Sequence, residues 1–196
     1  MKLYLITNRK SVAGGDFLKV IASAVEGGID GIILREKDLP GEDLLPLALG
    51  INKIIASRKV SLIINNNLKV AHTIQADGYH TGFYDFMQLQ SRFSGWNGVS
   101  VHNRDEAIRA AQNGASYLLA SHIFATDCKP GLKPKGVDLI REIKMNVDIP
   151  VIALGGINPV NCQQVLDAGA DGIAVMSLIM QATHPYRATK ILKSRC

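Results

Sequence analysis

Short apolar runs recur along the chain, and most of them are separated by segments whose apolar residues have helical spacing. In the first such segment, Leu18, Ile21 and Val25 share one face of a predicted helix. Continuous apolar runs of this length suit strands that are buried on both faces, as in a parallel sheet. Eight segments have this pattern: Lys2–Thr7, Gly31–Arg35, Val60–Asn65, Gly78–His80, Gly98–His102, Tyr117–His122, Val151–Gly155 and Gly172–Met176.

One turn recurs before half of these strands. A helix-like segment ends in Gly or Ala, a small-residue turn follows, and an apolar strand begins, as in EGGIDGIILRE (26–36), QADGYHTG (75–82), NGASYLLASH (113–122) and AGADGIAVMS (168–177). Glycine in such a turn ends a helix by adopting a positive φ. Two further helix starts are indicated, one by Asn103 with Glu106 and one by Asn158 followed by Pro159.

Strands that alternate with helices in this way predict a (β/α)8 TIM barrel, an α/β fold with a parallel sheet. The alternative is an open doubly wound sheet, but no GxGxxG follows the first strand, MKLYLITNRK. The 196 residues, 47% of them hydrophobic and 20% charged, fit one compact domain over residues 1–196.

Composition narrows the class of protein. The longest apolar runs, such as Tyr117–Ala120, are far too short to span a bilayer, and the chain does not start like a secretory signal. We therefore expect a cytoplasmic protein with no membrane partner, and its three cysteines as reduced thiols. The net charge of +5 is spread along the chain, which favours a phosphorylated small molecule over nucleic acid as the ligand.

Barrel enzymes carry their chemistry at the C-terminal ends of the strands. The residues at the predicted ends are polar and basic, with few acids. Those expected to contact substrate there are Arg35, Lys37, Asn65, Ser100, Met176 and Ser177. His80 and His102 occupy comparable positions.

Three of these ends suit anions. Gly155 and Gly156 follow the seventh strand, and Ser177 follows the eighth, where barrels often bind phosphate through free backbone N–H groups. The alternative is that the two glycines only make a tight turn. Arg35 and Lys37, two residues apart, suit a carboxylate or phosphate. Their alternative is a salt-bridged rim with Glu36 and Asp38 as partners.

The segment SHIFATDCKPG (121–131) carries the candidate catalytic residue. His122 ends an apolar strand and can donate or accept a proton near neutral pH. Thr126 and Lys129 in the following loop could bind an anion, whereas Cys128 lacks an evident base and is interpreted as a spectator thiol. The alternative for His122 is a core histidine bonded to a neighbouring backbone group.

The sequence predicts neither a metal nor a cofactor. Asp85 could ligate Mg²⁺, but its companion position at the end of the third strand holds the amide Asn66. Asp85 is therefore interpreted as the cap of a helix that begins near Phe86.

With these segments in order, the chain resembles the thiamine phosphate synthase/TenI family over nearly its whole length. The family's QLREK, INDR, serine strand and GPVFPTxTK loop appear as ILREK (33–37), INNN (64–67), GVSVHN (98–103) and SHIFATDCK (121–129), and its GGI and VxSxI motifs match at 155–157 and 175–179. The family includes a synthase, which couples a pyrimidine pyrophosphate to a thiazole phosphate with metal assistance. It also includes a thiazole tautomerase, which moves a proton without a metal.

The departures from the synthase motifs favour the tautomerase. Ile33 replaces a glutamine, Asn66 and Asn67 replace the metal-binding aspartate and an arginine, and His122 replaces a proline. The resemblance then implies that His122 is the acid/base that isomerises an exocyclic-alkene thiazole carboxylate phosphate to its aromatic form. It also implies a homo-oligomer. Two alternatives are a synthase and a non-catalytic regulatory protein that binds thiazole phosphate.

Overall fold

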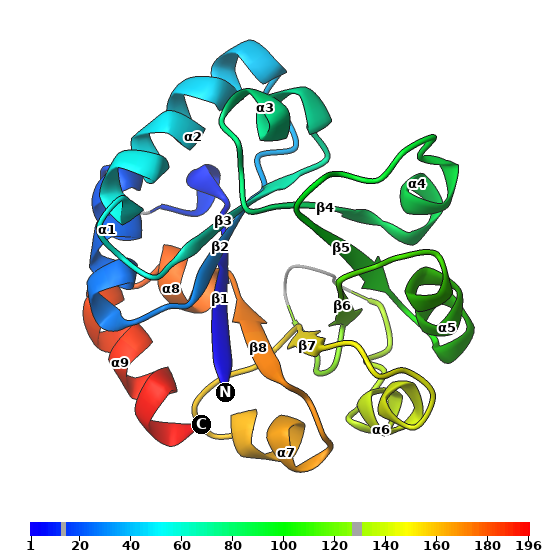
Figure 1. Cartoon of the computed structure of the whole chain (residues 1–196). Coiled ribbons are helices and arrows are strands. Elements are labelled where there is room, and N and C mark those ends of the chain that lie inside the picture. The colour runs from blue at the N-terminus through cyan, green and yellow to red at the C-terminus, as the bar shows by residue number, and fades with distance from the viewer. Residues whose placement is uncertain (13–14, 127–130) are drawn as a thin grey trace.

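A computed structural model describes residues 1–12, 15–126 and 131–196, and in it eight parallel strands close into a barrel in chain order (Figure 1). The strands are β1 (Lys2–Ile6), β2 (Gly31–Leu34), β3 (Ser61–Asn65), β4 (Gly78–Gly82), β5 (Trp96–Val101), β6 (Tyr117–Ser121), β7 (Val151–Leu154) and β8 (Gly172–Val175). β1 pairs with β8, with Lys2 opposite Gly172, so the sheet has no open edge. The predicted (β/α)8 TIM barrel is confirmed, and the open sheet is excluded.

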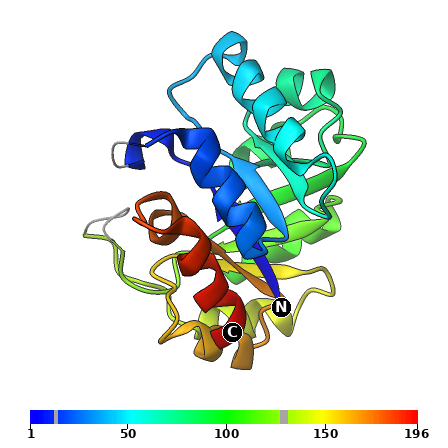
Figure 2. The ribbon, with the colours of Figure 1, turned by 90° about the vertical axis from the view of Figure 1, so that its left-hand side faces the viewer.

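Helices surround the barrel. They are the short 3₁₀ helix η1 (Arg9–Ser11), α1 (Phe17–Gly27), α2 (Gly41–Ile55), α3 (Leu68–Thr73), α4 (Phe83–Gln88), α5 (Arg104–Gln112), α6 (Asp138–Lys144), α7 (Cys162–Asp167), α8 (Ser177–Met180) and α9 (Pro185–Arg195). Figure 2 shows α1 and α9 side by side on the outside of the barrel. Among the described helices, none is long and apolar enough to cross a membrane.

The helix signals of the sequence are confirmed at some positions and wrong at others. The Asn103 side chain accepts a hydrogen bond from the Glu106 N–H at 2.8 Å, as a cap of α5 should. The predicted start at Asn158 and Pro159 is too early, because α7 begins at Cys162. Asn158 instead accepts from the Val160 N–H at 2.8 Å, which forms a turn before that helix.

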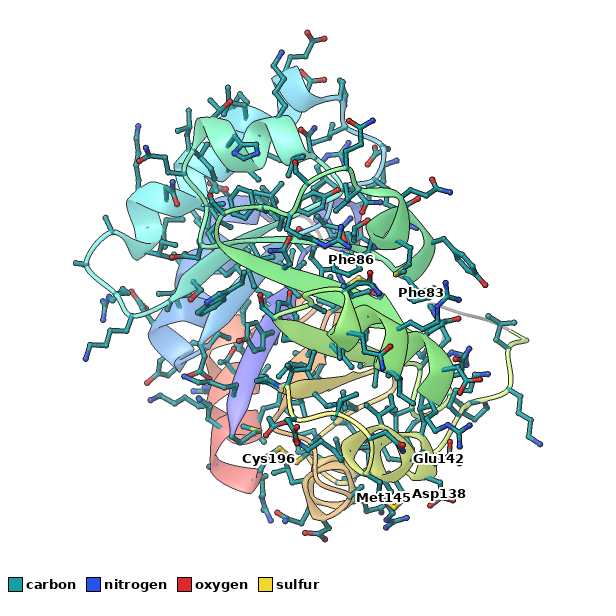
Figure 3. The ribbon with its side chains drawn as sticks, turned by 45° about the vertical axis from the view of Figure 1, so that its right-hand side comes forward. Phe83, Phe86, Asp138, Glu142, Met145 and Cys196 are labelled. Carbon is teal, nitrogen blue, oxygen red and sulfur yellow. A yellow bond between two sulfur atoms is a disulfide. The ribbon has the colours of Figure 1, made fainter. Side chains whose placement is uncertain are left out.

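Apolar side chains fill two regions. The larger one lies between the strands and the surrounding helices and includes Leu5, Leu34 and the fully buried Phe86 of α4, which is labelled in Figure 3. The smaller one lies inside the barrel and includes Ile6 and Ile33. Successive strand residues point to opposite faces, so Leu5 and Ile6 serve different regions. The filled interior gives the site above it a closed floor.

The recurring turn of the sequence has a physical function at the N-terminal end of the barrel. Just before β4, Asp77 accepts a hydrogen bond from the Leu62 N–H of β3 at 2.7 Å, and the Asp77 N–H donates to the Leu62 carbonyl at 3.0 Å. The same two-bond ring joins three other strand pairs, β1 with β2, β5 with β6 and β7 with β8. Its side-chain bonds are Leu3 N–H to Asp30 at 2.7 Å, Asn97 N–H to Ser116 at 2.9 Å and Val151 N–H to Asp171 at 2.8 Å.

Asp30 also links the two ends of the chain. Its carboxylate lies 2.7 Å from the Lys193 ammonium on α9 and 3.8 Å from that of Lys2 on β1. The ends marked N and C lie near each other in both Figure 1 and Figure 2.

The cysteines differ from the prediction. Cys162, at the start of α7, forms a disulfide with Cys196, whose Cα atom lies 5.8 Å away. Cys196 is labelled in Figure 3. The expectation of reduced thiols is therefore wrong for these two residues. Their pairing depends on a contact between positions 34 residues apart, which no local pattern reveals. Cys128 lies outside the described residues.

Candidate active site

A cavity of about 600 Å³ opens at the C-terminal ends of the strands. Its lining includes every predicted site residue that the structure describes: Arg35, Lys37, Asn65, Ser100, His122, Thr126, Gly155, Gly156, Met176 and Ser177. Lys129 lies outside the described residues. The structure thus brings the predicted residues together, while the role of each remains a prediction.

Sequence reasoning left out part of the lining. Asn8 and Ser11, which follow β1, also line the cavity. His80 and Asp85 line it as well, although the sequence assigned neither of them to the ligand. The signal for Asn8 was available, because it follows a strand end just as Arg35 and Lys37 do. His80 was noted at a strand end but was not separated from the other histidines.

The β2 loop directs two cations into the cavity by turning the residue between them away. Arg35 and Lys37 line the cavity, whereas Glu36 is buried behind them. The Thr7 hydroxyl donates to Glu36 at 2.7 Å, and the Arg9 N–H donates to both carboxylate oxygens at 3.0 Å. These bonds fix the loop from its outer side.

The salt-bridged rim predicted as an alternative exists, but with other cations. Asp38 accepts two bonds of 2.7 Å from the Arg9 guanidinium and lies 2.9 Å from the Lys10 ammonium. The hydrogen bonds from Arg9 and then Lys10 hold the pKa of Asp38 well below its usual range. The acids of the loop are thus paired with residues after β1, and Lys37 and Arg35 keep their place in the cavity lining.

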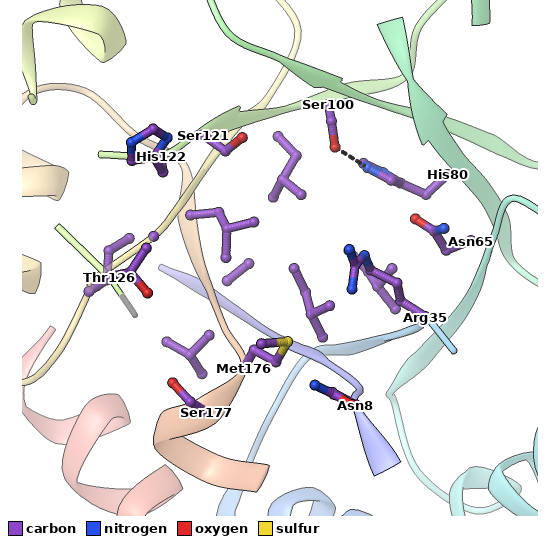
Figure 4. A pocket seen from close by; sticks show the side chains of 18 of the residues that line it. Asn8, Arg35, Asn65, His80, Ser100, Ser121, His122, Thr126, Met176 and Ser177 are labelled. Carbon is purple, nitrogen blue, oxygen red and sulfur yellow. Dashed lines mark hydrogen bonds between the residues drawn. The ribbon is translucent and has the colours of Figure 1, made fainter. Parts of the chain in front are cut away.

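A chain of hydrogen bonds runs from the cavity into the barrel. His80 Nε2 lies 2.8 Å from the Ser100 hydroxyl, the bond dashed in Figure 4, and His80 Nδ1 lies 2.9 Å from the Tyr117 hydroxyl. Burial, and to a lesser extent the positive charge of Arg35, lower the pKa of His80 to about 3. Burial also raises the pKa of Tyr117 well above its ordinary value. Both groups are therefore uncharged at neutral pH.

His122 is buried at the end of β6, with a 5% exposed fraction. Its Nε2 lies 3.3 Å from the Leu132 carbonyl, which can only accept, so Nε2 carries the hydrogen. In a neutral imidazole Nδ1 is then the acceptor, and it is buried without a partner among the residues that the structure describes. The backbone bond agrees with the core-histidine alternative, whereas the unpaired Nδ1 in a cavity-lining residue leaves an acceptor for a ligand.

Backbone conformation and packing together require the two glycines after β7, whether or not a ligand binds there. Gly155 and Gly156 have φ of 108° and 64°, values that side chains disfavour. A Cβ at Gly155 would lie 2.7 Å from the Cβ of His122, and one at Gly156 would collide with the Ala125 carbonyl. The tight-turn alternative therefore has a firm physical basis. It is compatible with phosphate binding, because both residues also line the cavity beside Ser177.

Asp85 is not the helix cap that the sequence predicts. α4 begins at Phe83, so Asp85 lies within its first turn, and its side chain lines the cavity. Asn66 lines the cavity too and has a positive φ of 56°, which asparagine tolerates better than most residues. Asn67 instead caps α3, accepting from the Val70 N–H at 3.0 Å.

Known proteins resemble this chain over nearly its whole length. The thiamine-phosphate synthase of Clostridium acetobutylicum is 39% identical over 92% of this chain and 88% of its own, and that of Chloroflexus aurantiacus is 38% identical over 98% and 91%. The solved structure of thiamine phosphate pyrophosphorylase from Pyrococcus furiosus matches with a TM-score of 0.85 and 30% identity, covering 99% of this chain and 94% of that one.

These relatives contradict the tautomerase prediction. They carry the name of a synthase, a transferase, at 39% and 38% identity, so the expectation of an isomerase was wrong. That expectation gave decisive weight to a few positions, chiefly His122 and Asn66. A histidine that is bonded to a carbonyl and packed on Gly155 has structural reasons to be there. Its presence does not select a reaction.

The family itself is shown by a match along most of the sequence. The profile of the family described as thiamine monophosphate synthase, TMP-TENI, matches residues 3–179. With the barrel, the cavity and the relatives in agreement, the chain belongs to the thiamine monophosphate synthase family.

Proposed function

We propose that this protein is a transferase that couples a pyrimidine pyrophosphate to a thiazole phosphate and so forms thiamine phosphate. The bond between the pyrimidine's methylene carbon and pyrophosphate breaks, and a bond from that carbon to the thiazole nitrogen forms. The observation that carries the proposal is the 39% identity, over 92% of the chain, to a relative named thiamine-phosphate synthase.

The cavity supports a reaction of two anionic substrates. On one side lie Arg35, Asn65 and Ser100, and on the other lie Thr126 and Ser177, as Figure 4 shows. Its volume of about 600 Å³ is in the range of small-molecule sites. We assign the pyrophosphate to the first side, where Arg35 and Lys37 supply positive charge, and the thiazole phosphate to the side of Ser177 and Gly156.

Arg35 and Lys37 would contribute most as pyrophosphate leaves. Negative charge grows on the leaving oxygen as the bond breaks, and cations already fixed beside it lower the barrier without reorganising. Glu36 holds this loop through Thr7 and Arg9, so the cations are oriented before substrate arrives.

The proposed reaction asks no proton transfer of His122, because the thiazole nitrogen attacks with its lone pair. The unpaired Nδ1 of His122 would instead accept a hydrogen bond from a substrate donor. This replaces the acid/base role that the sequence predicted for this residue.

The cavity also offers a carboxylate to the magnesium ion that the family implies, so the amide at Asn66, which argued against a metal in the sequence, does not exclude one. Mg²⁺ is typically held by one or two carboxylates together with substrate phosphates rather than by a cage of protein ligands. Asp85 and Asn66 line the cavity and would hold it, while the described residues contain no cluster of three or more metal-binding side chains. When bound, the ion would neutralise charge on the departing pyrophosphate.

Incubation of the purified protein with both substrates and Mg²⁺ tests the proposal, with thiamine phosphate measured by mass spectrometry. We expect product, and an increase of at least tenfold in KM for the pyrimidine pyrophosphate in Lys37→Ala. Lys19→Ala, which removes the same charge from an exposed position on α1, is the control and should behave as the parent. Binding of both substrates without product at any Mg²⁺ concentration would overturn the proposal and favour a regulatory protein.

A further inference from the structure

His80, Ser100 and Tyr117 form a hydrogen-bonded row that the proposed reaction does not yet use. Ser100 lines the cavity, His80 is buried beneath it, and Tyr117 lies deeper still inside the barrel. The two bonds, 2.8 Å and 2.9 Å long, engage both ring nitrogens of His80. A neutral imidazole has one N–H and one lone pair, so the row has two possible directions.

The hydrogen of Tyr117 decides between these directions. Within the described ranges, His80 Nδ1 is the one hydrogen-bond partner of the Tyr117 hydroxyl. If His80 carried its hydrogen on Nδ1, the Tyr117 hydrogen would be buried without an acceptor, at a cost of about fivefold or more in population. If Tyr117 donates to Nδ1, both buried hydrogens, those of Tyr117 and His80, have an acceptor.

We infer that Tyr117 fixes His80 as the tautomer with hydrogen on Nε2, and that the hydroxyl hydrogen of Ser100 is thereby kept available to the ligand. His80 Nε2–H donates to the Ser100 oxygen, so the Ser100 hydrogen points to the cavity. Ser100 can then donate to a ligand atom that accepts, such as a phosphate oxygen or a ring nitrogen, whereas in the other tautomer its hydrogen would be used in the bond to His80 Nε2. His80 and Tyr117 are positioning residues in this arrangement.

The backbone beside the row makes room for it. Gly98 lies two residues before Ser100 in β5, so both face the inside of the barrel. A Cβ at Gly98 would overlap the Tyr117 ring and hydroxyl and would lie 2.5 Å from His80 Nδ1. The Tyr117–His80 bond therefore requires glycine at this position. Its φ is not positive, so the requirement comes from space rather than from backbone conformation.

The inference rests on the proposed function only for the identity of the ligand, which we take to be pyrophosphate on the Arg35 side of the cavity. ¹⁵N NMR of histidine-labelled protein tests the tautomer directly. The His80 signals are assigned by their loss in His80→Gln. We expect hydrogen on Nε2, with the other tautomer below about one fifth.

Two variants connect the tautomer to binding. Tyr117→Phe keeps the ring but removes the hydroxyl, so the Nδ1–H form should rise toward half and the affinity for inorganic pyrophosphate should fall about twofold. Ser100→Ala should weaken pyrophosphate binding about 10-fold or more, the worth of a hydrogen bond to an anion. Tyr4→Phe, which alters the ring stacked 6.2 Å from Tyr117, is the matched control and should change neither.

Hydrogen on Nδ1 of His80 in the parent protein would overturn the inference, as would parental pyrophosphate affinity in Ser100→Ala. Neither result depends on catalysis. A protein that forms thiamine phosphate but carries the Nδ1–H tautomer would refute this inference alone. One with the expected tautomer and no coupling would refute the proposed function alone.

Discussion

Replacing Asp77 with alanine should weaken the barrel without affecting its site. The substitution removes the carboxylate that accepts the Leu62 N–H at 2.7 Å, while the backbone bond from Asp77 to the Leu62 carbonyl at 3.0 Å can persist. Leu62 is fully buried in β3, so its N–H is left with a weak partner or none. The perturbed end of the barrel is opposite the cavity.

The magnitude follows from the kind of bond. A hydrogen bond to a charged group contributes about 1.5–3 kcal/mol to stability. Asp77 itself is exposed, so water can partly replace the lost carboxylate, and the lower half of that range applies. We expect Asp77→Ala to lose about 2 kcal/mol. Asp77→Asn keeps an amide oxygen that can accept, and should lose about 1 kcal/mol or less.

Urea unfolding measures the free energy, and hydrogen exchange of the Leu62 amide reports on the bond itself. Exchange at Leu62 should accelerate in Asp77→Ala, whereas the affinity for pyrophosphate should stay at the parental value. Asp77→Ala within about 0.5 kcal/mol of the parent would refute the reasoning, since surface changes without a role fall in that range. So would an asparagine variant as unstable as the alanine one.

Three further predictions concern other parts of the molecule. Gly98→Ala should cost about 1–3 kcal/mol by overpacking the barrel interior. Gly82→Ala is the control, because Gly82 has a φ of −74° and an added Cβ there meets nothing nearer than the Asp85 carboxylate at 3.9 Å; equal losses in urea unfolding would contradict the collision argument. Reduction of the disulfide between Cys162 and Cys196, which are 34 residues apart, should lower stability by about 2–4 kcal/mol, and full thiol titration of the untreated protein would disprove the pairing. The third prediction concerns acid. The pKa of His80 in the folded protein, about 3, lies below its value in the unfolded chain, so the unfolded chain binds more protons as pH falls. The free energy of unfolding should therefore drop by about 2 kcal/mol between pH 7 and pH 5. His80→Gln should lack that part of the pH dependence, and an unchanged pH profile would count against the burial argument.

The strands were predictable because each is buried on both faces and is followed by a change to polar residues. The predicted ends were nonetheless one residue too long in six strands, at Thr7, Arg35, His102, His122, Gly155 and Met176. At the cavity the strands diverge into loops, so these residues leave the ladder, and all of them except Thr7 line the cavity. Hydropathy cannot separate the last paired residue from the first one beyond it.

The relations between distant residues were not predictable. One alternative paired Glu36 within its own loop, yet its partners Thr7 and Arg9 are 29 and 27 residues away in sequence. The bond between His80 and Tyr117 likewise joins two strands that are not neighbours. Such pairs depend on how the strands are placed in the barrel, and the hydropathy pattern predicts the barrel without predicting which side chains meet in it. The reaction was mispredicted for a similar reason, because single residues were weighed without their packing partners.

The position of Asp30 bears on how the polypeptide could be rearranged. One carboxylate holds Lys2 and Lys193, residues near the two ends of the chain, and β1 pairs with β8 as other neighbouring strands pair. The barrel is therefore closed by the pairing of β1 with β8, although no peptide bond connects these two strands directly. A short linker across that gap, with a cut in a loop elsewhere, gives a circular permutant that keeps each of these contacts. The geometry of the fold does not specify which strand must come first.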